Sequence, residues 1–221
     1  MVVGATVFVG QPPADAYQPA ERKLGITRSV IEVLSEHHHP FSLITKSAGV
    51  ERDLDLISPM AQRNLAVVDV SITTPDAALA RVMEPRAASP ERRLATIRRL
   101  AQAGVPVGVS VSPVIPFLNE PELERIVDAA RDAGATSAFS IVIRLPWEVN
   151  PLFQQWLAQH FPARAARVMA RIRAMRGGAD NSGQFGERMR PAAGCGPSCC
   201  GNASRTPARG WACSVTGSNW T

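Results

Sequence analysis

Residues 65–111 decide the fold, and they read LAVVDVSITTPDAALARVMEPRAASPERRLATIRRLAQAGVPVGVSV. Leu65–Ile72 and Val105–Val111 are β-branched apolar runs, so each one predicts a buried strand. Between them, the Ser-Pro-Glu of residues 89–91 has the N-cap, the N1 proline and the early acid that start a helix, and Gly104 is a typical C-cap. A strand, a helix and a second strand in this order indicate a parallel β-α-β unit.

The same alternation continues on both sides of this unit. The other predicted strands are Val2–Gly10, Phe41–Thr45 and Ser137–Leu145. The other predicted helices are Pro19–His37, Val50–Asn64, Asp76–Met83, Glu120–Ala133, Pro151–Phe161 and Ala163–Arg176. Apolar strands that alternate with helices predict an α/β fold with a buried parallel sheet, either open or part of a (β/α) barrel. In both cases ligands bind at the carboxyl ends of the strands.

The composition is that of a globular protein whose basic charge lies at one end. The 221 residues are 45% hydrophobic and 19% charged, and the net charge is +5. Residues 1–160 carry more acids than cations, so the whole excess belongs to residues 161–221. A one-sided basic segment favours an anionic partner such as DNA, although an arginine-rich solvated helix has the same composition. Because no run of 18 apolar residues is present, we expect a cytoplasmic protein without a transmembrane helix.

Polar side chains follow each predicted strand. DAYQPAE (residues 15–21) comes after the first, TKS (45–47) after the second and SITT (71–74) after the third. SPVIPFLNE (112–120) comes after the fourth and RLPWE (144–148) after the fifth. Because parallel strands end at one edge of a sheet, these hydroxyls, carboxylates and cations are expected to share one rim and to form a binding site.

Several consecutive segments resemble one family. They are DAYQPAE, SLITKS, VDVSITT, MEPRAASPERRLATIRRLAQAGVPVGVSVSPVIPFLNE, the downstream IRLPWEVNPLFQQWLAQHFPARAARVMARIRAMRGG, and FGERMR. In this order they are similar to the radical SAM proteins related to spore photoproduct lyase, which are often labelled DNA repair photolyases. The resemblance runs from about Asp15 to Arg190.

The resemblance implies a partial (β/α)6 barrel over residues 1–190 with C-terminal helices, and it implies two cofactors. Family members bind S-adenosylmethionine (SAM) across the strand ends, and a 4Fe-4S cluster on a CxxxCxxC loop cleaves SAM reductively to a 5′-deoxyadenosyl radical. Intact relatives use that radical to abstract hydrogen from a substrate. The residues of this chain at matching positions are Tyr17 and Glu21 for the methionine end of SAM, Lys46 for its carboxylate, Ser71 and Thr73 for the ribose, and Ser110 for the adenine.

The chain departs from the family pattern at the cluster. No cysteine precedes Cys195, and Cys195-Gly-Pro-Ser-Cys199-Cys200 does not continue into CxxxCxxC because residue 202 is asparagine. We therefore expect a truncated, inactive product without a cluster and without a metal site. Residues 191–221 contain no acid and show no apolar periodicity, so we predict an irregular, disordered Cys/Gly/Ser-rich tail and a frameshift near codon 190.

Two other functions are consistent with the residues. Arg164, Arg167 and Arg171 have helical spacing and form one stripe, so the basic end predicts a nucleic-acid-binding remnant. Lys46 at a strand end is also compatible with a Schiff-base lyase on a plain barrel, or with a lysine that only snorkels. Each polar strand-end residue has an ordinary structural alternative in turn or cap hydrogen bonding.

Overall fold

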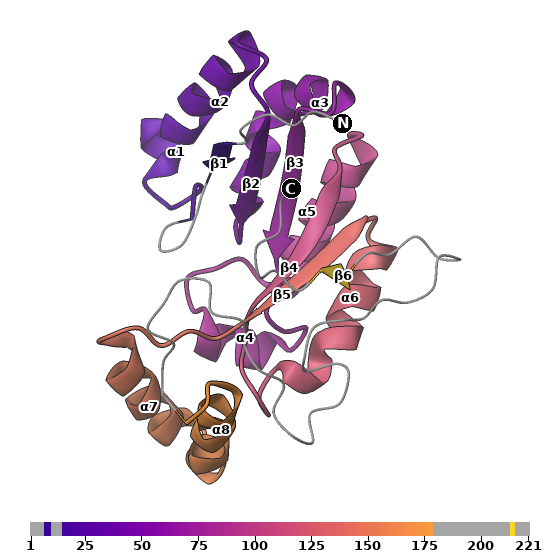
Figure 1. Cartoon of the computed structure of the whole chain (residues 1–221). Coiled ribbons are helices and arrows are strands. Elements are labelled where there is room, and N and C mark those ends of the chain that lie inside the picture. Colours follow the sequence, from indigo (N-terminus) through magenta and orange to yellow (C-terminus); the bar gives the residue numbers. More distant parts are fainter. Residues whose placement is uncertain (1–6, 10–14, 179–212, 215–221) are drawn as a thin grey trace. The chain divides into compact units, whose positions relative to one another are not determined.

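The computed structural model describes residues 7–9, 15–178 and 213–214, which form two compact units (Figure 1). The first unit comprises Met1–Ser110 and Glu124–Ala138, and the second comprises Val111–Leu123 and Phe139–Thr221. The first unit holds β1 (Val7–Val9), α1 (Glu21–Leu24), α2 (Ile26–Glu36), β2 (Phe41–Thr45), η1 (Ala48–Asp53), α3 (Leu54–Gln62), β3 (Ala66–Ser71), α4 (Ala77–Met83), α5 (Pro90–Gln102) and most of α6 (Leu123–Asp132). The second holds η2 (Glu120–Glu122), α7 (Val149–His160), α8 (Pro162–Met175) and β6 (Cys213–Ser214). Strands β4 (Val107–Val114) and β5 (Ser137–Val142) begin in the first unit and continue in the second.

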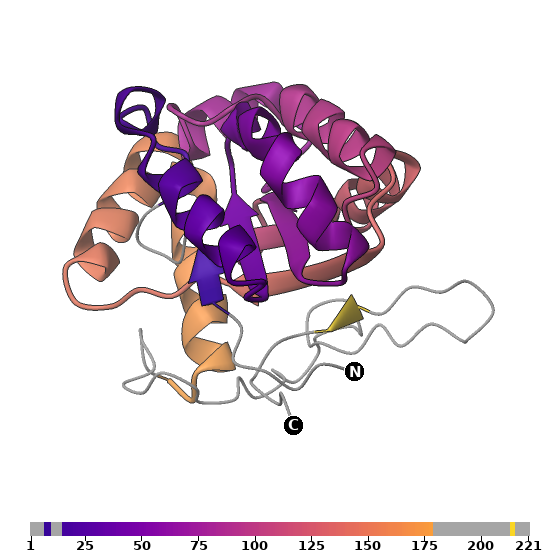
Figure 2. The ribbon, with the colours of Figure 1, turned by 90° about the horizontal axis from the view of Figure 1, so that it is seen from above.

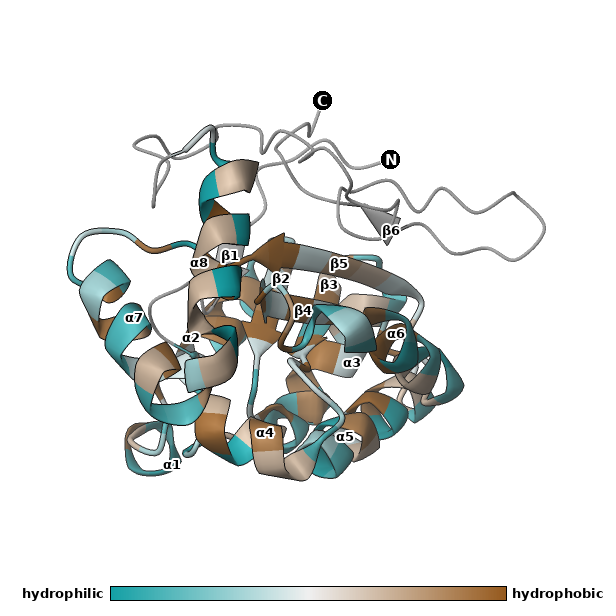
Figure 3. Ribbon diagram, turned by 90° about the horizontal axis from the view of Figure 1, so that it is seen from below, coloured by the Kyte–Doolittle hydropathy of each residue, from teal (hydrophilic) through white to brown (hydrophobic). Residues whose placement is uncertain are grey.

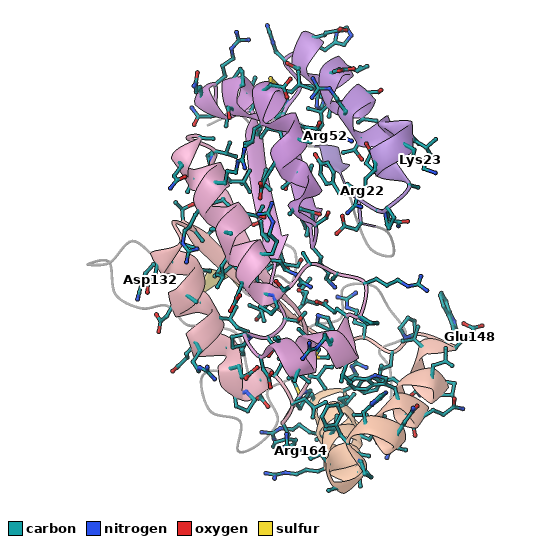
Figure 4. All side chains as sticks on the ribbon, turned by 180° about the vertical axis from the view of Figure 1, so that it is seen from behind. Arg22, Lys23, Arg52, Asp132, Glu148 and Arg164 are labelled. Carbon is teal, nitrogen blue, oxygen red and sulfur yellow. The ribbon has the colours of Figure 1, made fainter. Side chains whose placement is uncertain are left out.

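Strands β1 to β4 pair in chain order, and every pair is parallel. Helices α3 and α5 both pack on β3. They lie behind the strands in Figure 1 and in front of them in Figure 4, and the view from above again places them on one side of the strands (Figure 2). Chain-order strands with helices on one face are typical of a (β/α) barrel, whereas a doubly wound sheet reverses its order and is covered on both faces. The fold is therefore α/β, a partial TIM-like barrel, as the sequence predicted.

Alternation along the strands separates an apolar face from a polar one. Leu43, Val68 and Val107 share one register row and are buried, as are Val70 and Val109 one step further along. The helices contribute Ile31, Ile57, Ile97 and Leu100, all fully buried. Figure 3 shows brown, hydrophobic segments along the strands and teal on the outer turns of the helices. Each such side chain stabilises the fold by about 1.5–3 kcal/mol relative to an exposed one.

Several predicted boundaries differ from the structure, and the helices predicted over Val50–Asn64 and Glu120–Ala133 each begin as a 3-10 helix, η1 and η2. The helix predicted over Pro19–His37 is divided into α1 and α2 by Gly25, whose φ of 62° is left-handed and ends α1 as a C-cap. The strand predicted to end at Val111 continues to Val114, so part of the expected loop extends β4 instead. The predicted tail, residues 191–221, lies outside the described residues apart from the two of β6.

An apolar stripe lies exposed on α2. Ile26, Val30 and Val33 have spacings of four and three, so they share one helix face, and each is at least 40% exposed. β1 has β2 as its one strand neighbour within the described part of the chain, which leaves its other edge without a described partner. Both features favour self-association.

We expect the purified chain to be oligomeric or poorly soluble, because this stripe and this edge present apolar surface and unpaired backbone to solvent. Replacing Ile26, Val30 and Val33 with lysine is expected to shift the mass measured by light scattering after size exclusion toward the monomer. The same substitutions at exposed polar positions of α6 (Glu124, Asp128 and Asp132) are the control. A parent chain that is already a monodisperse monomer with a sharp melt would contradict the expectation.

Candidate functional site

A charged cluster forms where β2 and β3 end. The Lys46 Nζ lies 2.7 Å from the Glu84 Oε1, and the Arg93 NH2 group lies 2.6 Å from the Glu84 Oε2. The Thr73 Oγ1 donates a hydrogen bond of 3.0 Å to the same Oε2. Lys46 follows β2, Thr73 follows β3 and Glu84 ends α4, so three segments converge on one carboxylate. The structure thus brings together two of the predicted site residues, Lys46 and Thr73.

Arg93 of α5 holds this cluster in position through hydrogen bonds. Its side chain is 2% exposed, and its guanidinium donates to the Ser71 carbonyl at 2.8 Å and to the Ala88 carbonyl at 2.8 Å as well as to Glu84. Arg93 lies in the first turns of α5, the helix that the Ser89 cap starts, and from there it reaches the Ser71 carbonyl at the end of β3. A buried cation with this many acceptors fixes both the strand end and the carboxylate.

Glu84 stays ionised in this setting. Burial alone would raise the pKa of Glu84, but the adjacent Arg93 and Lys46 cations outweigh it and hold the pKa below its ordinary value. Oε1 has no aligned hydrogen bond, although the Lys46 ammonium is within ion-pair distance. The 2.7 Å ion pair with Glu84 therefore positions the Lys46 ammonium. Its side chain is 36% exposed, which leaves its N–H donors accessible to a ligand.

The face of the sheet opposite the apolar one carries small polar residues, and we call it the inner face. Ser71 of β3 pairs in register with Ser110 of β4, so the two hydroxyls project from the same face. Both residues are buried. The structure therefore places two further predicted site residues side by side, with Ser71 at the end of β3 and Ser110 in the middle of β4, within the first unit.

Tyr17 and Glu21 lie in a separate buried network. The Tyr17 hydroxyl donates to the Asp53 Oδ2 at 2.9 Å, and the Glu21 carboxylate accepts from the Thr27 N–H at 3.0 Å and from the Arg52 NH2 group at 2.9 Å. Figure 4 shows Arg52 near Arg22 and Lys23 of α1. Burial, together with the Asp53 charge and hydrogen bond, raises the pKa of Tyr17, so the phenol stays neutral. Both predicted residues are satisfied by protein partners, and in this structure they fix the chain that leads into α2.

Asp15 holds the candidate site in place, and sequence reasoning did not single it out. Its carboxylate accepts from the Thr45 Oγ1 at 2.7 Å and from the Lys46 N–H at 2.6 Å, and the Tyr17 N–H donates to it at 2.8 Å. Asp15 thereby holds the backbone from which Lys46 projects. The signal that was available is its position after the first strand, two residues before Tyr17.

The predicted arginine stripe lies on α8, in the second unit. The Arg164 NH1 group donates to the Phe117 carbonyl at 3.3 Å, and the Arg167 guanidinium lies 4.0 Å from the centre of the Phe117 ring. Arg171 lies 5.8 Å from the same ring, and its Nε is buried without a hydrogen-bond partner. Part of the stripe is thus engaged by one aromatic side chain. Arg164 and Arg167 remain exposed to solvent.

Neither a metal site nor a membrane segment was found in the described part of the chain. Within residues 7–9, 15–178 and 213–214, no three His, Cys, Asp or Glu side chains gather to hold a metal ion. The described helices are all too short or too polar to cross a bilayer. Cys195, Cys199 and Cys200 lie outside the described residues.

Comparison with known proteins gives three kinds of match. The model of the Radical SAM superfamily matches residues 3–130. Uncharacterized proteins of Mycobacterium bovis and Mycobacterium tuberculosis are 32% identical over 155 residues, which is 69% of this chain and 46% of theirs. An uncharacterized protein of Methanocaldococcus jannaschii is 26% identical over 152 residues, which is 67% of this chain and 54% of its own.

A solved structure of a spore photoproduct lyase, a single-residue mutant, is similar to this chain. The TM-score is 0.49 and the identity is 18%, and the match covers 69% of this chain and 47% of that one. The chain spans about half the length of the curated relatives it matches.

Proposed function

The chain belongs to the radical SAM superfamily, and from this premise we propose that its strand ends bind S-adenosylmethionine, with Lys46 receiving the carboxylate of the methionine moiety. The observation that carries the proposal is the ion pair of 2.7 Å between Lys46 and the buried Glu84. A lysine held by a carboxylate keeps its place before a ligand arrives. The adjacent Ser71 and Ser110 supply neutral hydroxyls of the kind that recognise a ribose or an adenine edge.

The donor set fits the nucleoside and not the iron–sulfur cluster. An iron–sulfur cluster would supply the electron that cleaves the sulfonium, and it needs thiolates. Residues 1–194 contain no cysteine, and CxxxCxxC does not occur anywhere in the chain. We therefore assign to this chain binding and orientation of SAM, and no step of its cleavage. Tyr17 and Glu21 support the site through the backbone that they hold.

Lys46→Met is expected to weaken SAM binding at least tenfold, because the substitution removes the cation that would pair with the carboxylate. Methylthioadenosine lacks that carboxylate, so its affinity is expected to be unchanged. Lys23→Met is the matched control, since Lys23 is the only other lysine and lies exposed on α1. Isothermal titration of both ligands against the three proteins measures the effect. An equal loss for both ligands would show that Lys46 acts on folding alone, and no loss for SAM would refute the proposal.

The Schiff-base alternative requires a free amine at Lys46. An imine would form at the Lys46 Nζ, and its formation would break the 2.7 Å ion pair with Glu84. The ion pair with Glu84 therefore supports anion binding over imine formation. Borohydride trapping with a carbonyl substrate remains the direct test of that alternative.

A second candidate function is electrostatic binding of nucleic acid by α8. The helix reads PARAARVMARIRAM and contains no acid, and this observation favours a phosphate-tracking surface. The contacts of Arg164 and Arg167 with Phe117 order these two side chains and leave both exposed.

Changing Arg164, Arg167 and Arg171 to alanine is expected to reduce the salt dependence of duplex binding, with a slope in log K against log salt smaller by up to about 3. Fluorescence anisotropy of a labelled DNA duplex at low and moderate salt measures this slope. Alanine at Arg22, Lys23 and Arg98 removes the same charge from exposed positions elsewhere and serves as the control. Equal slopes for the two triple variants would leave α8 as an ordinary solvated helix.

A further inference from the structure

One carboxylate on the inner face has no role in the site described above. Asp69 lies on β3, two residues before Ser71, so it sits about 6.6 Å deeper along the strand than that hydroxyl. It is in register with Gly108 of β4, and their side-chain positions face the same way. Asp69 is only partly exposed, and none of the hydrogen bonds or ion pairs of the described residues involves its side chain.

Gly108 makes room for this carboxylate. A Cβ at position 108 would lie 2.1 Å from the Asp69 Oδ1 and 2.6 Å from the Ser137 Oγ, so the carboxylate and the hydroxyl converge over the glycine. Both distances are shorter than real Cβ contacts, and the absence of a side chain at 108 is therefore what allows Asp69 to adopt this position. We call Asp69, Gly108 and Ser137 the Asp69 cradle, and all three lie in the first unit.

Among the described residues, the Asp69 carboxylate has no cation that would balance its charge. Desolvation by burial raises the pKa of Asp69 to about 6, and no neighbouring cation offsets it. At neutral pH the group is an ionised carboxylate without a hydrogen-bond donor among the described residues, which is unfavourable for the fold unless a ligand provides one. The charged clusters of this unit are elsewhere, since Lys46 and Arg93 are paired with Glu84, and Arg28 and Arg52 with Asp53.

We propose that the Asp69 cradle is a binding subsite for an ammonium group carried by a ligand that enters the inner face of the sheet. A carboxylate with one neighbouring hydroxyl matches a single compact cation, because charge-assisted hydrogen bonds are the strongest that such a group can make. A divalent metal would need several oxygen ligands, and the inner-face residues in register with Asp69 and Ser71 add no second carboxylate. The inference stands without the proposed SAM site, because it uses none of the residues that would bind the cofactor.

The test uses propylammonium chloride as the probe, with ionic strength held constant by sodium chloride at pH 7.5. Aspartate carboxyl carbons are labelled with ¹³C, and the Asp69 resonance is identified by its loss in Asp69→Asn. We expect this resonance to shift saturably with propylammonium, and 1-propanol, which has the same size and no charge, to bind at least tenfold more weakly. Asp132→Asn, which alters an exposed carboxylate of α6, is expected to leave the response intact.

Two further results decide the proposal. Gly108→Ala places a methyl group where the carboxylate lies, so it is expected to abolish the response while the circular dichroism spectrum is retained. If that variant does not fold, Asp69→Asn remains sufficient, because it removes charge and keeps shape. A linear, unsaturable shift, or an equal response to propanol, would show that the carboxylate is merely hydrated and would overturn the subsite. Neither result bears on SAM binding, which is measured separately with the Lys46 variant.

Discussion

Arg93→Met is expected to lower the free energy of unfolding by about 3–5 kcal/mol, which is a large part of the stability of a domain of this size. The guanidinium is 2% exposed and donates to the Ser71 carbonyl, the Ala88 carbonyl and Glu84. Methionine fills a similar volume and keeps the helix propensity, so the loss comes from the polar groups left behind. The Glu84 carboxylate keeps Lys46 and Thr73 but loses its buried counter-ion. Urea denaturation followed by circular dichroism measures the change.

Two controls separate this electrostatic loss from a general effect of the substitution. Arg98→Met lies on the same helix at an exposed position and is expected to change stability by less than about 0.5 kcal/mol. Adding Glu84→Gln to Arg93→Met removes the stranded charge, so the double variant is expected to be more stable than the sum of the single effects predicts. Strict additivity would mean that Arg93 stabilises the fold through its two carbonyl contacts alone.

The sequence predicted the fold well because hydrophobic periodicity and cap residues are local signals. The strand predicted over Phe41–Thr45 has the same bounds in the structure, and α5 begins after its predicted Ser89 cap. The predicted helix that is divided into α1 and α2 contains Gly25, and the pattern of apolar residues continues across this glycine in the sequence. A left-handed φ interrupts a helix without interrupting its periodicity, so the break was not visible in the pattern.

The site was predicted less completely, because partners that are distant in sequence meet only in the fold. Lys46 was identified from its place at a strand end, and that reasoning also applies to Thr73. The role of Arg93 was not foreseen, since a basic residue inside a helix usually faces solvent and the pattern ERRLATIRR gives no sign that one arginine is buried. Asp69 was read only as part of a strand, because the space above Gly108 depends on the register of two strands that no local signal specifies.

Asp53 shows the same limitation in the hydrogen-bond network that Tyr17 joins, and it carries the second large effect. The residue is fully buried, and its carboxylate accepts hydrogen bonds from Arg52, Arg28 and the Tyr17 hydroxyl at 2.8–3.1 Å. Asp53→Asn keeps the shape but removes the charge and one acceptor. Because Arg28 and Arg52 are about one-third exposed, water can solvate them, and we expect a loss near about 3 kcal/mol, the lower end for a broken buried pair. Asp55→Asn is the matched control, since Asp55 binds the same Arg28 but is 57% exposed, and its loss is expected to be below about 1 kcal/mol.

The pH dependence identifies the cause of the Asp53 effect. Burial by itself would raise the pKa of Asp53, but the hydrogen bonds from Arg52, Tyr17 and Arg28 outweigh it and hold the pKa below its ordinary value. A carboxyl whose pKa is lower in the folded chain stabilises the fold fully above the unfolded pKa of about 3.9, and this stabilisation is lost as pH falls toward the folded pKa. The stability difference between the parent chain and Asp53→Asn is therefore expected to be largest between about pH 6 and 8 and to shrink below about pH 4. A difference that stays constant across this range would mean that packing, and not the charge of Asp53, holds α2 and η1 together.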